Sequence, residues 1–147
     1  NSLKIERFLM SVQLFKKYTQ AFVDSDWDTV SSIYAEDCVG VDPDGSIFEG
    51  RESNLANDKK WASMMSDFNF NYVNTVESGN STVVELEITG TMTGEMETPD
   101  GSKIPPTGKT HTFKACMIMD WDNGKIKKQR IYSDFMSFMA GFGLIPP

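Results

Sequence analysis

Histidine and cysteine are scarce in this chain, which has one His and two Cys among its 147 residues. A structural zinc site needs about four closely spaced Cys or His ligands, and a Ser-His-Asp triad needs a histidine beside its nucleophile. The sequence also lacks a Gly-rich phosphate loop and a Gly-x-Ser-x-Gly motif. We therefore expect no bound metal, no cofactor and no chemistry of the serine-hydrolase type.

Long hydrophobic runs and an excess of positive charge are missing as well. The apolar runs span only a few residues, whereas a helix that crosses a membrane needs about 20. With 14 basic and 21 acidic residues, the net charge is −7 and the chain repels phosphate backbones. We expect neither membrane nor nucleic acid among its partners. No signal-like segment opens the chain, which favours a cytoplasmic protein; a periplasmic or secreted one stays open because the native N-terminus is not visible.

What is present is the composition of an ordinary folded domain. Hydrophobic residues make up 39% of the chain and charged residues 24%, a balance unlike that of disordered or collagen-like sequences. A chain of this length can bury most of its apolar surface in one core. We expect a single domain over residues 1–147.

The first part of the chain has the apolar spacing of helices. Between Ser2 and Asp24, apolar residues recur at steps of three and four, which predicts one long amphipathic helix. Asp26 is a suitable N-cap for a second, shorter helix, and a third is expected after Gly50. The stripe of the first helix consists of Ile5, Phe8, Leu9, Val12, Phe15, Tyr18 and Phe22.

The rest of the chain has the alternating pattern of β-strands. Strands are expected over residues 38–42, 68–76, 84–92, 110–121 and 125–133, with turn residues between them. Residues 95–109 are predicted to form a loop, and residues 135–142 a short helix or coil. Helices followed by strands indicate an α+β fold with helices on one face of a curved sheet.

Two stretches carry a resemblance to a known family. The first runs from Tyr18 through Tyr34-Ala-Glu-Asp37 to Val41-Asp42-Pro43-Asp44-Gly45-Ser46. The second consists of Pro105-Pro106-Thr107-Gly108-Lys109, Asn123-Gly124-Lys125-Ile126 and Gly143-Leu144-Ile145-Pro146. The chain resembles the cone-shaped α+β proteins that include ketosteroid isomerases, nuclear transport factor and SnoaL-like polyketide cyclases. The resemblance implies three N-terminal helices packed on the concave face of a curved antiparallel sheet, and a homodimer.

The isomerase side of this resemblance implies a catalytic role for Asp42 and Tyr18. Asp42 falls on the position of the general base, and Tyr18 on that of the donor to an enolate oxygen. The second acidic donor of the isomerases falls on Cys116, or on Met117 if the hairpin differs by one residue, and neither replaces a protonated carboxyl. The alternative interpretation is that Asp42 belongs to a turn and Tyr18 to the core.

The cyclase side of the resemblance implies a catalytic role for Asp134. In SnoaL-like cyclases the corresponding Asp is the general acid/base of an aldol ring closure without cofactor. Arg130 has the same strand parity as Asp134, so we expect both side chains on one side of the sheet. The alternative is that Asp134 caps a helix that begins at the next residue.

The expected pocket is apolar and holds a small hydrophobic molecule. Which face of the strand over residues 110–121 lines it is left open, since a shift of one residue exchanges the two faces. The predicted wall consists of Tyr34, Trp61, Met92, His111, Cys116, Met117 and Arg130. The leading hypothesis is a cofactor-free acid/base enzyme, of cyclase or isomerase type, for a small hydrophobic carbonyl compound. The alternative is a non-catalytic domain for small-molecule binding or dimerisation.

Overall fold

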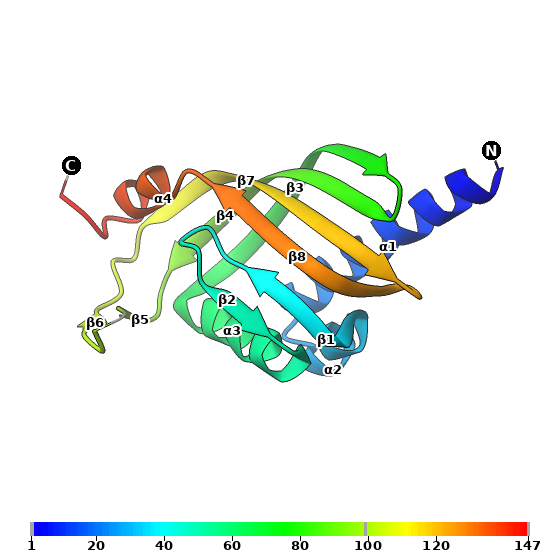
Figure 1. Ribbon diagram of the computed structural model, residues 1–147. Coiled ribbons are helices and arrows are strands. Elements are labelled where there is room, and N and C mark those ends of the chain that lie inside the picture. Colours follow the sequence, from blue (N-terminus) through cyan, green and yellow to red (C-terminus); the bar gives the residue numbers. More distant parts are fainter. Residues whose placement is uncertain (1, 99, 147) are drawn as a thin grey trace.

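A computed structural model describes residues 2–98 and 100–146, and within them the chain forms four helices and eight strands (Figure 1). The helices are α1 (Ser2–Val23), α2 (Trp27–Ile33), α3 (Arg51–Met64) and α4 (Phe135–Gly141). The strands are β1 (Tyr34–Val41), β2 (Ile47–Glu49), β3 (Met65–Ser78), β4 (Ser81–Met92), β5 (Met96–Glu97), β6 (Lys103–Ile104), β7 (Thr110–Asp122) and β8 (Lys125–Ser133). The predicted helices and main strands are confirmed. The expected loop over residues 95–109 contains one short hairpin, β5 with β6.

Six strands form one sheet in the order β2-β1-β8-β7-β4-β3. Four of its five pairings are antiparallel, as expected, and only β1 and β8 run parallel. A tight hairpin requires antiparallel strands, but β1 and β8 are joined through most of the chain, so either direction is open to them. The expected α+β architecture with a curved sheet is therefore confirmed, with a mixed rather than a wholly antiparallel sheet.

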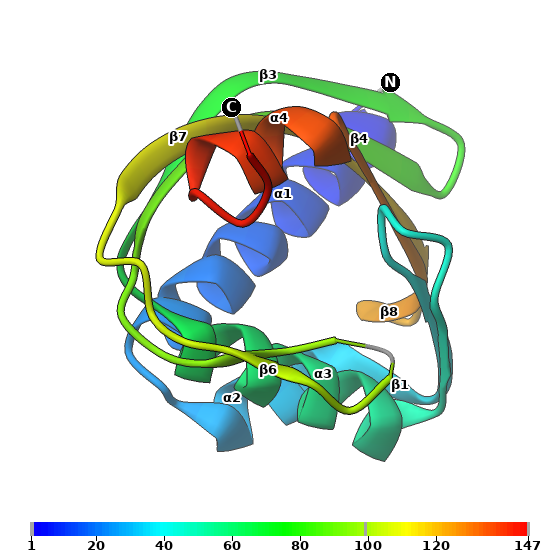
Figure 2. The ribbon, with the colours of Figure 1, turned by 90° about the vertical axis from the view of Figure 1, so that its left-hand side faces the viewer.

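Helix α1 lies in the hollow of the sheet. In Figure 2, β3, β4 and β7 pass over α1. Helices α2 and α3 lie beneath α1, and α4 lies near one open end of the sheet. The described stripe of α1 confirms this packing, because Phe15, Tyr18 and Phe22 are all buried in the main core. The side chains of Ile5, Phe8 and Leu9 lie outside the described residues. The three N-terminal helices thus lie on the concave side of the sheet, and α4 is a fourth helix. No described helix has both the length and the apolar character needed to cross a membrane.

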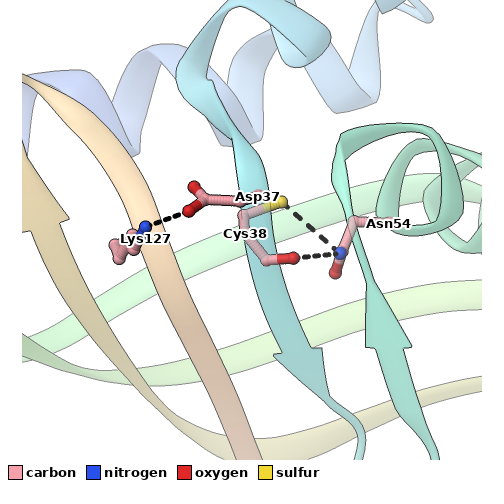
Figure 3. Close-up of polar contacts among 4 residues, drawn as sticks. All are labelled: Asp37, Cys38, Asn54 and Lys127. Atoms are coloured by element: carbon pink, nitrogen blue, oxygen red, sulfur yellow. Dashed lines mark hydrogen bonds and ion pairs between the residues drawn. The ribbon is translucent and has the colours of Figure 1, made fainter.

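Asn54 fixes the start of α3 against β1 (Figure 3). Its Nδ2 donates a hydrogen bond of 2.8 Å to Gly50 O and lies 3.5 Å from Cys38 O. Gly40 is required below it, since a Cβ at that position would lie 2.1 Å from Asn54 Oδ1. Residues four apart lie on one face of a helix, so the same inward face that carries Asn54 also carries Asp58.

The side chains of β1 alternate between two different environments. Cys38 is buried toward α3, and burial raises the pKa of its thiol to about 11, which keeps the thiol protonated at neutral pH. The neighbouring Asp37 reaches the other way and forms an ion pair with Lys127 of β8, as Figure 3 shows. This alternation places the residues of β1 that face α1 and α3 on the hollow side of the sheet.

Candidate active site

A cavity of about 100 Å³ lies in the hollow, between α1, α3, α4 and the concave face of the sheet. Three of its lining residues are polar or acidic: Asp42, Asp58 and Ser133. Its aliphatic lining consists of Pro43, Ile88, Met117 and Ile131. Its aromatic lining consists of Tyr18, Phe22, Trp61, Phe68, Phe70, Phe113, Phe135 and Phe138. Two carboxyl groups therefore share a small, mainly aromatic cavity.

Asp58 is the most deeply buried acid at this cavity. Its side chain projects inward from α3, the residue is only 8% exposed, and it meets two tyrosine hydroxyls. Tyr34 donates to Asp58 Oδ2 at 2.7 Å, and Tyr18 lies 3.1 Å from each of the two carboxylate oxygens. The pKa of Asp58 is raised to about 7, mainly by burial and to a small extent by the nearby Asp42, although the two tyrosine hydrogen bonds lower it. Asp58 thus exchanges its proton near neutral pH.

The two tyrosines act as neutral hydrogen-bond donors. Burial is the main reason why the pKa of Tyr18 and that of Tyr34 both lie well above the usual value. Their hydroxyl oxygens lie 3.2 Å apart, so the two rings and Asp58 form one connected network. A hydrogen bond from the buried Gln129 also reaches Tyr18, and Gln129 Oε1 has no hydrogen-bond partner among the described residues.

Asp42 is the second acid, and it lies directly after β1. The backbone forms the predicted turn, with Gly45 N donating to Asp42 O at 2.9 Å. The side chain of Asp42 takes no part in this turn and accepts hydrogen bonds from Asn57 Nδ2 at 3.0 Å and Trp61 Nε1 at 3.3 Å. Burial raises the pKa of Asp42, while these two hydrogen bonds lower it. Asp42 therefore has donors that stabilise its carboxylate, in a setting that makes it more basic than a surface Asp.

Together these residues can transfer protons. Two carboxyl groups in different environments divide into one that holds a proton and one that is ionised. Asp42, with an amide and an indole as donors, suits the ionised form, and Asp58 suits the protonated form at pH values below about 7. When Asp58 carries a proton it no longer needs both tyrosine hydrogens, and the Tyr18 hydroxyl can then donate to a molecule in the cavity.

The structure brings together five of the predicted site residues. Tyr18, Asp42, Trp61 and Met117 line the cavity. Tyr34 does not line it but donates a hydrogen bond to Asp58, which does. The open question about β7 is decided in favour of its apolar face, because Met117 is 4% exposed and lines the cavity. The position of the second isomerase donor is therefore occupied by a methionine, which donates no hydrogen bond.

Asp134 lies outside the cavity, which corrects its predicted placement. It is the N-cap of α4, where its carboxylate accepts hydrogen bonds from Ser137 N at 3.0 Å and Ser137 Oγ at 2.8 Å. These bonds lower the pKa of the exposed Asp134. The preceding residue, Ser133, lines the cavity, and strand alternation turns Asp134 away. The interpretation of Asp134 as a helix cap is confirmed.

Arg130 and Cys116 are also on the opposite face of the sheet. A β-bulge between the pairs Asp120–Lys128 and Trp121–Ile126 adds one residue to β8, so Arg130 faces outward. Its Nη1 pairs with Asp120 Oδ2 at 2.9 Å. Cys116 lines a groove of about 530 Å³ on that outer face, together with Tyr132 and Asp134. This groove is larger than the inner cavity but is lined by none of the groups that bind Asp42 or Asp58.

His111 and Met92 support α4 and do not line the cavity. The ring of His111 lies edge-on to Phe142 with centroids 5.3 Å apart, and it packs against the backbone of Gly141. Met92 is fully buried in a second core cluster below α4, with Phe138 among its members. Both residues therefore act on the cavity only through the helix that closes one end of it.

Asp58 is the site residue that sequence analysis missed. It stands in the polar run Asn57-Asp58-Lys59-Lys60, which has the composition of a solvent-exposed helix face. The available signal was positional: residues 54, 58, 61 and 65 follow steps of four and three, so Asp58 shares a stripe with Trp61. A buried polar stripe on a helix that also carries an inward Trp indicates a site.

Comparisons with known proteins agree with the fold. A family model described as SnoaL-like polyketide cyclase matches residues 12–141. No curated protein matches the chain. Among solved structures, a SnoaL-like protein from Jannaschia sp. CCS1 superposes with a TM-score of 0.81 at 16% identity, covering 94% of each chain.

Two further solved structures are similar in fold. An LEH-like epoxide hydrolase from M. tuberculosis has a TM-score of 0.71 at 16% identity, covering 93% of this chain and 92% of its own. An NTF2-like protein of unknown function from Burkholderia pseudomallei has a TM-score of 0.72 at 17% identity, covering 90% and 97%. At such identities the likeness shows a shared fold, within which the chemistry of the cavity has to be argued from its own residues.

Proposed function

Because the chain belongs to the SnoaL-like polyketide cyclase family, we propose that it is a cofactor-free acid/base enzyme for a small hydrophobic carbonyl compound. The observation that carries the proposal is the pairing of two acids at one apolar cavity: Asp42, bound by Asn57 and Trp61, and Asp58, bound by two tyrosines. Apolar cavities with a few converging polar groups and shifted pKa values are typical of active sites.

The proposed first step is the removal of a proton next to the carbonyl group. The carboxylate of Asp42 takes the proton, the C–H electron pair forms the enolate double bond, and the carbonyl π electrons move to oxygen. The Tyr18 hydroxyl donates a hydrogen bond to that oxygen. It is free to do so because Asp58, when protonated, no longer receives the hydrogen bond from Tyr18. Asp42 then returns the proton to another carbon in an isomerisation. In a cyclisation, the enolate carbon attacks a second carbonyl of the substrate, and the new alkoxide takes the proton from Asp42.

The cavity also limits the size of the substrate. Its volume of about 100 Å³ lies below the range of about 300–1,000 Å³ that is usual for ligand sites. Phe135 and Phe138 of α4 form part of its wall, so a larger ligand would have to displace the rings of this helix. We therefore propose a substrate with few heavy atoms, or one that inserts only its carbonyl end.

Solvent deuterium exchange tests the proposal directly. Wild-type protein is incubated in D₂O with small ketones, such as cyclopentanone and cyclohexanone, and loss of the α-proton signal is followed by NMR. We expect exchange that is faster with wild-type protein than with Asp42→Asn, and unchanged by the matched surface substitution Asp28→Asn. Equal exchange with wild-type protein and Asp42→Asn would contradict the proposal. Binding of the ketones without exchange would favour a non-catalytic binding domain.

A homodimer is proposed through the outer face of the sheet. The groove there exposes two large apolar side chains, Val76 at 50% and Tyr132 at 56%. Glu85 and Lys114 line the same groove, so two copies related by a twofold axis can pair opposite charges across it. Such a dimer would cover the convex face and leave the inner cavity of each copy intact.

A further inference from the structure

The cavity combines aromatic walls with negative charge. Six phenylalanines, Trp61 and Tyr18 line it, and the faces of such rings carry the negative part of the ring quadrupole. Rings on several sides of a small space are the arrangement that attracts organic cations in proteins. The rings come from α1, α3, α4, β3 and β7, so they surround the space and do not merely form one hydrophobic floor.

The negative charge at this cavity has no protein counter-ion. Asp42 is the acid that suits the ionised form, Asp58 holds a proton at pH values below about 7, and no Lys, Arg or His of the described chain lines the cavity. The ion pairs formed by the described residues all lie elsewhere, such as the pair between Arg130 and Asp120 on the outer face. Buried carboxylates normally pair with a cation, since an unpaired buried charge is costly.

A third acceptor nearby is also without a partner. Gln129 is 6% exposed and hydrogen-bonds to Tyr18, yet its Oε1 has no donor among the described residues. Nearly all buried side-chain oxygens in proteins are hydrogen-bonded, so an unpaired one calls for an explanation. Gln129 does not line the cavity, so its oxygen adds an unpaired acceptor beside the Tyr18 network, while the acids and the aromatic rings at the cavity itself favour a positively charged group.

We propose that the cavity binds a small organic ammonium ion, with its nitrogen among the aromatic rings and its charge opposite the carboxylate of Asp42. The inference rests on the proposed function for its role in turnover: the substrate would be a carbonyl compound that carries an ammonium group. A nearby cation acidifies the C–H bond beside the carbonyl and stabilises the enolate oxygen. It would thus supply the positive charge that Met117, a wall residue without a hydrogen-bond donor, does not supply.

Binding of choline tests the proposal against a neutral molecule of the same shape. The matched compound is the carbon analogue of choline, in which a tert-butyl group replaces the trimethylammonium group. NMR of ¹⁵N-labelled protein follows the indole N–H of Trp61, which donates to Asp42 at 3.3 Å. Trp121 is the internal control, because its indole donates to Thr82 and it does not line the cavity.

We expect choline to bind at least about tenfold more tightly than its carbon analogue and to shift the Trp61 signal but not that of Trp121. Asp42→Asn should remove most of this preference, while Asp28→Asn on the surface should keep it. Equal affinity of the two compounds for wild-type protein, or a Trp61 signal that does not move, would overturn the inference, and this comparison requires no variant to fold.

The outcomes separate this inference from the proposed function. Ketone exchange that depends on Asp42, together with equal binding of choline and its analogue, would overturn the ammonium site alone. Preference for choline without any exchange would overturn the proposed reaction alone and leave a binding site for cations.

Discussion

The Tyr34 hydroxyl, from the first residue of β1, donates a hydrogen bond of 2.7 Å to the carboxylate of Asp58 in the middle of α3. This bond connects the first strand of the sheet to the helix that covers it. It also holds an acid in place at a depth where ionisation is costly. The same carboxylate receives the Tyr18 hydroxyl of α1, so three elements converge on one acidic group.

The burial of Asp58 predicts an unusual dependence of stability on pH. Its pKa is about 7 in the folded protein and near 3.8 when unfolded, so between these values the folded state binds more protons. Folding stability should therefore be highest near the lower value and fall as pH rises through 7, by an amount of the order of a few kcal/mol. Urea unfolding of wild-type protein and Asp58→Asn at pH 5, 6, 7 and 8 measures this. A difference between the two proteins that stays constant with pH would contradict it.

The hydroxyl of Tyr18 should matter for exchange activity more than for folding. Removal of one donor to a developing oxyanion typically lowers a rate by about 10²–10³-fold. Tyr18→Phe should therefore lower ketone exchange by about that factor while keeping the ring in the core. Tyr72→Phe is the matched control, since the Tyr72 hydroxyl bonds Thr19 and does not line the cavity. Equal rates for the two variants would remove Tyr18 from the mechanism.

Gly141 should resist substitution because of His111. A Cβ on Gly141 would lie 2.3 Å from the imidazole ring, which is far inside van der Waals contact. Gly141→Ala should therefore lower the free energy of unfolding by about 1–3 kcal/mol. Adding His111→Ala should restore part of the loss, because the clash disappears. Chemical denaturation of both single variants and the double variant measures the coupling, and strictly additive losses would show that the two residues do not press on each other.

The outer face of the sheet should be the dimer interface. Val76→Asp combined with Tyr132→Asp places like charges on that face and should convert a dimer to monomers in size-exclusion chromatography with light scattering. Met136→Asp is the control, because Met136 is 68% exposed on α4 and lies outside this groove. A wild-type protein that is monomeric at high concentration, or a dimer that survives both charges, would argue against this interface.

Apolar periodicity made most of the fold predictable. Val84, Leu86 and Ile88 alternate with polar residues along β4, and the structure buries all three. The side of Arg130 was not predictable in the same way. A single bulge in β8 reverses the faces of the residues that follow it, and the hydrophobic pattern of a strand contains no clear mark of one inserted residue.

The candidate site was predictable only where polar residues interrupt an apolar pattern. Tyr18 lies in the apolar stripe of α1, and its hydroxyl has a buried partner, as a hydroxyl in that position requires. Asp58 was hidden because its neighbours along the chain are polar, and only its helical spacing to Trp61 indicates that it faces inward. Single-sequence patterns thus locate buried apolar surfaces better than they locate buried charges.

Asp134 should act as the cap of α4 and not as a catalytic acid. The carboxylate of Asp134 caps α4 through Ser137 and lies on the outer side of the sheet, so its loss should weaken the helix and leave proton transfer intact. Asp134→Ala should lower the thermal midpoint of unfolding. Asp134→Asn, which keeps a capping oxygen, should retain most of it. Both variants, assayed below their midpoints, should exchange ketone protons within about twofold of the wild-type rate, since neither change reaches the cavity. If Asp134→Asn kept its stability but lost exchange, Asp134 rather than Asp42 would be the working acid, and the reaction would take place outside the cavity described above.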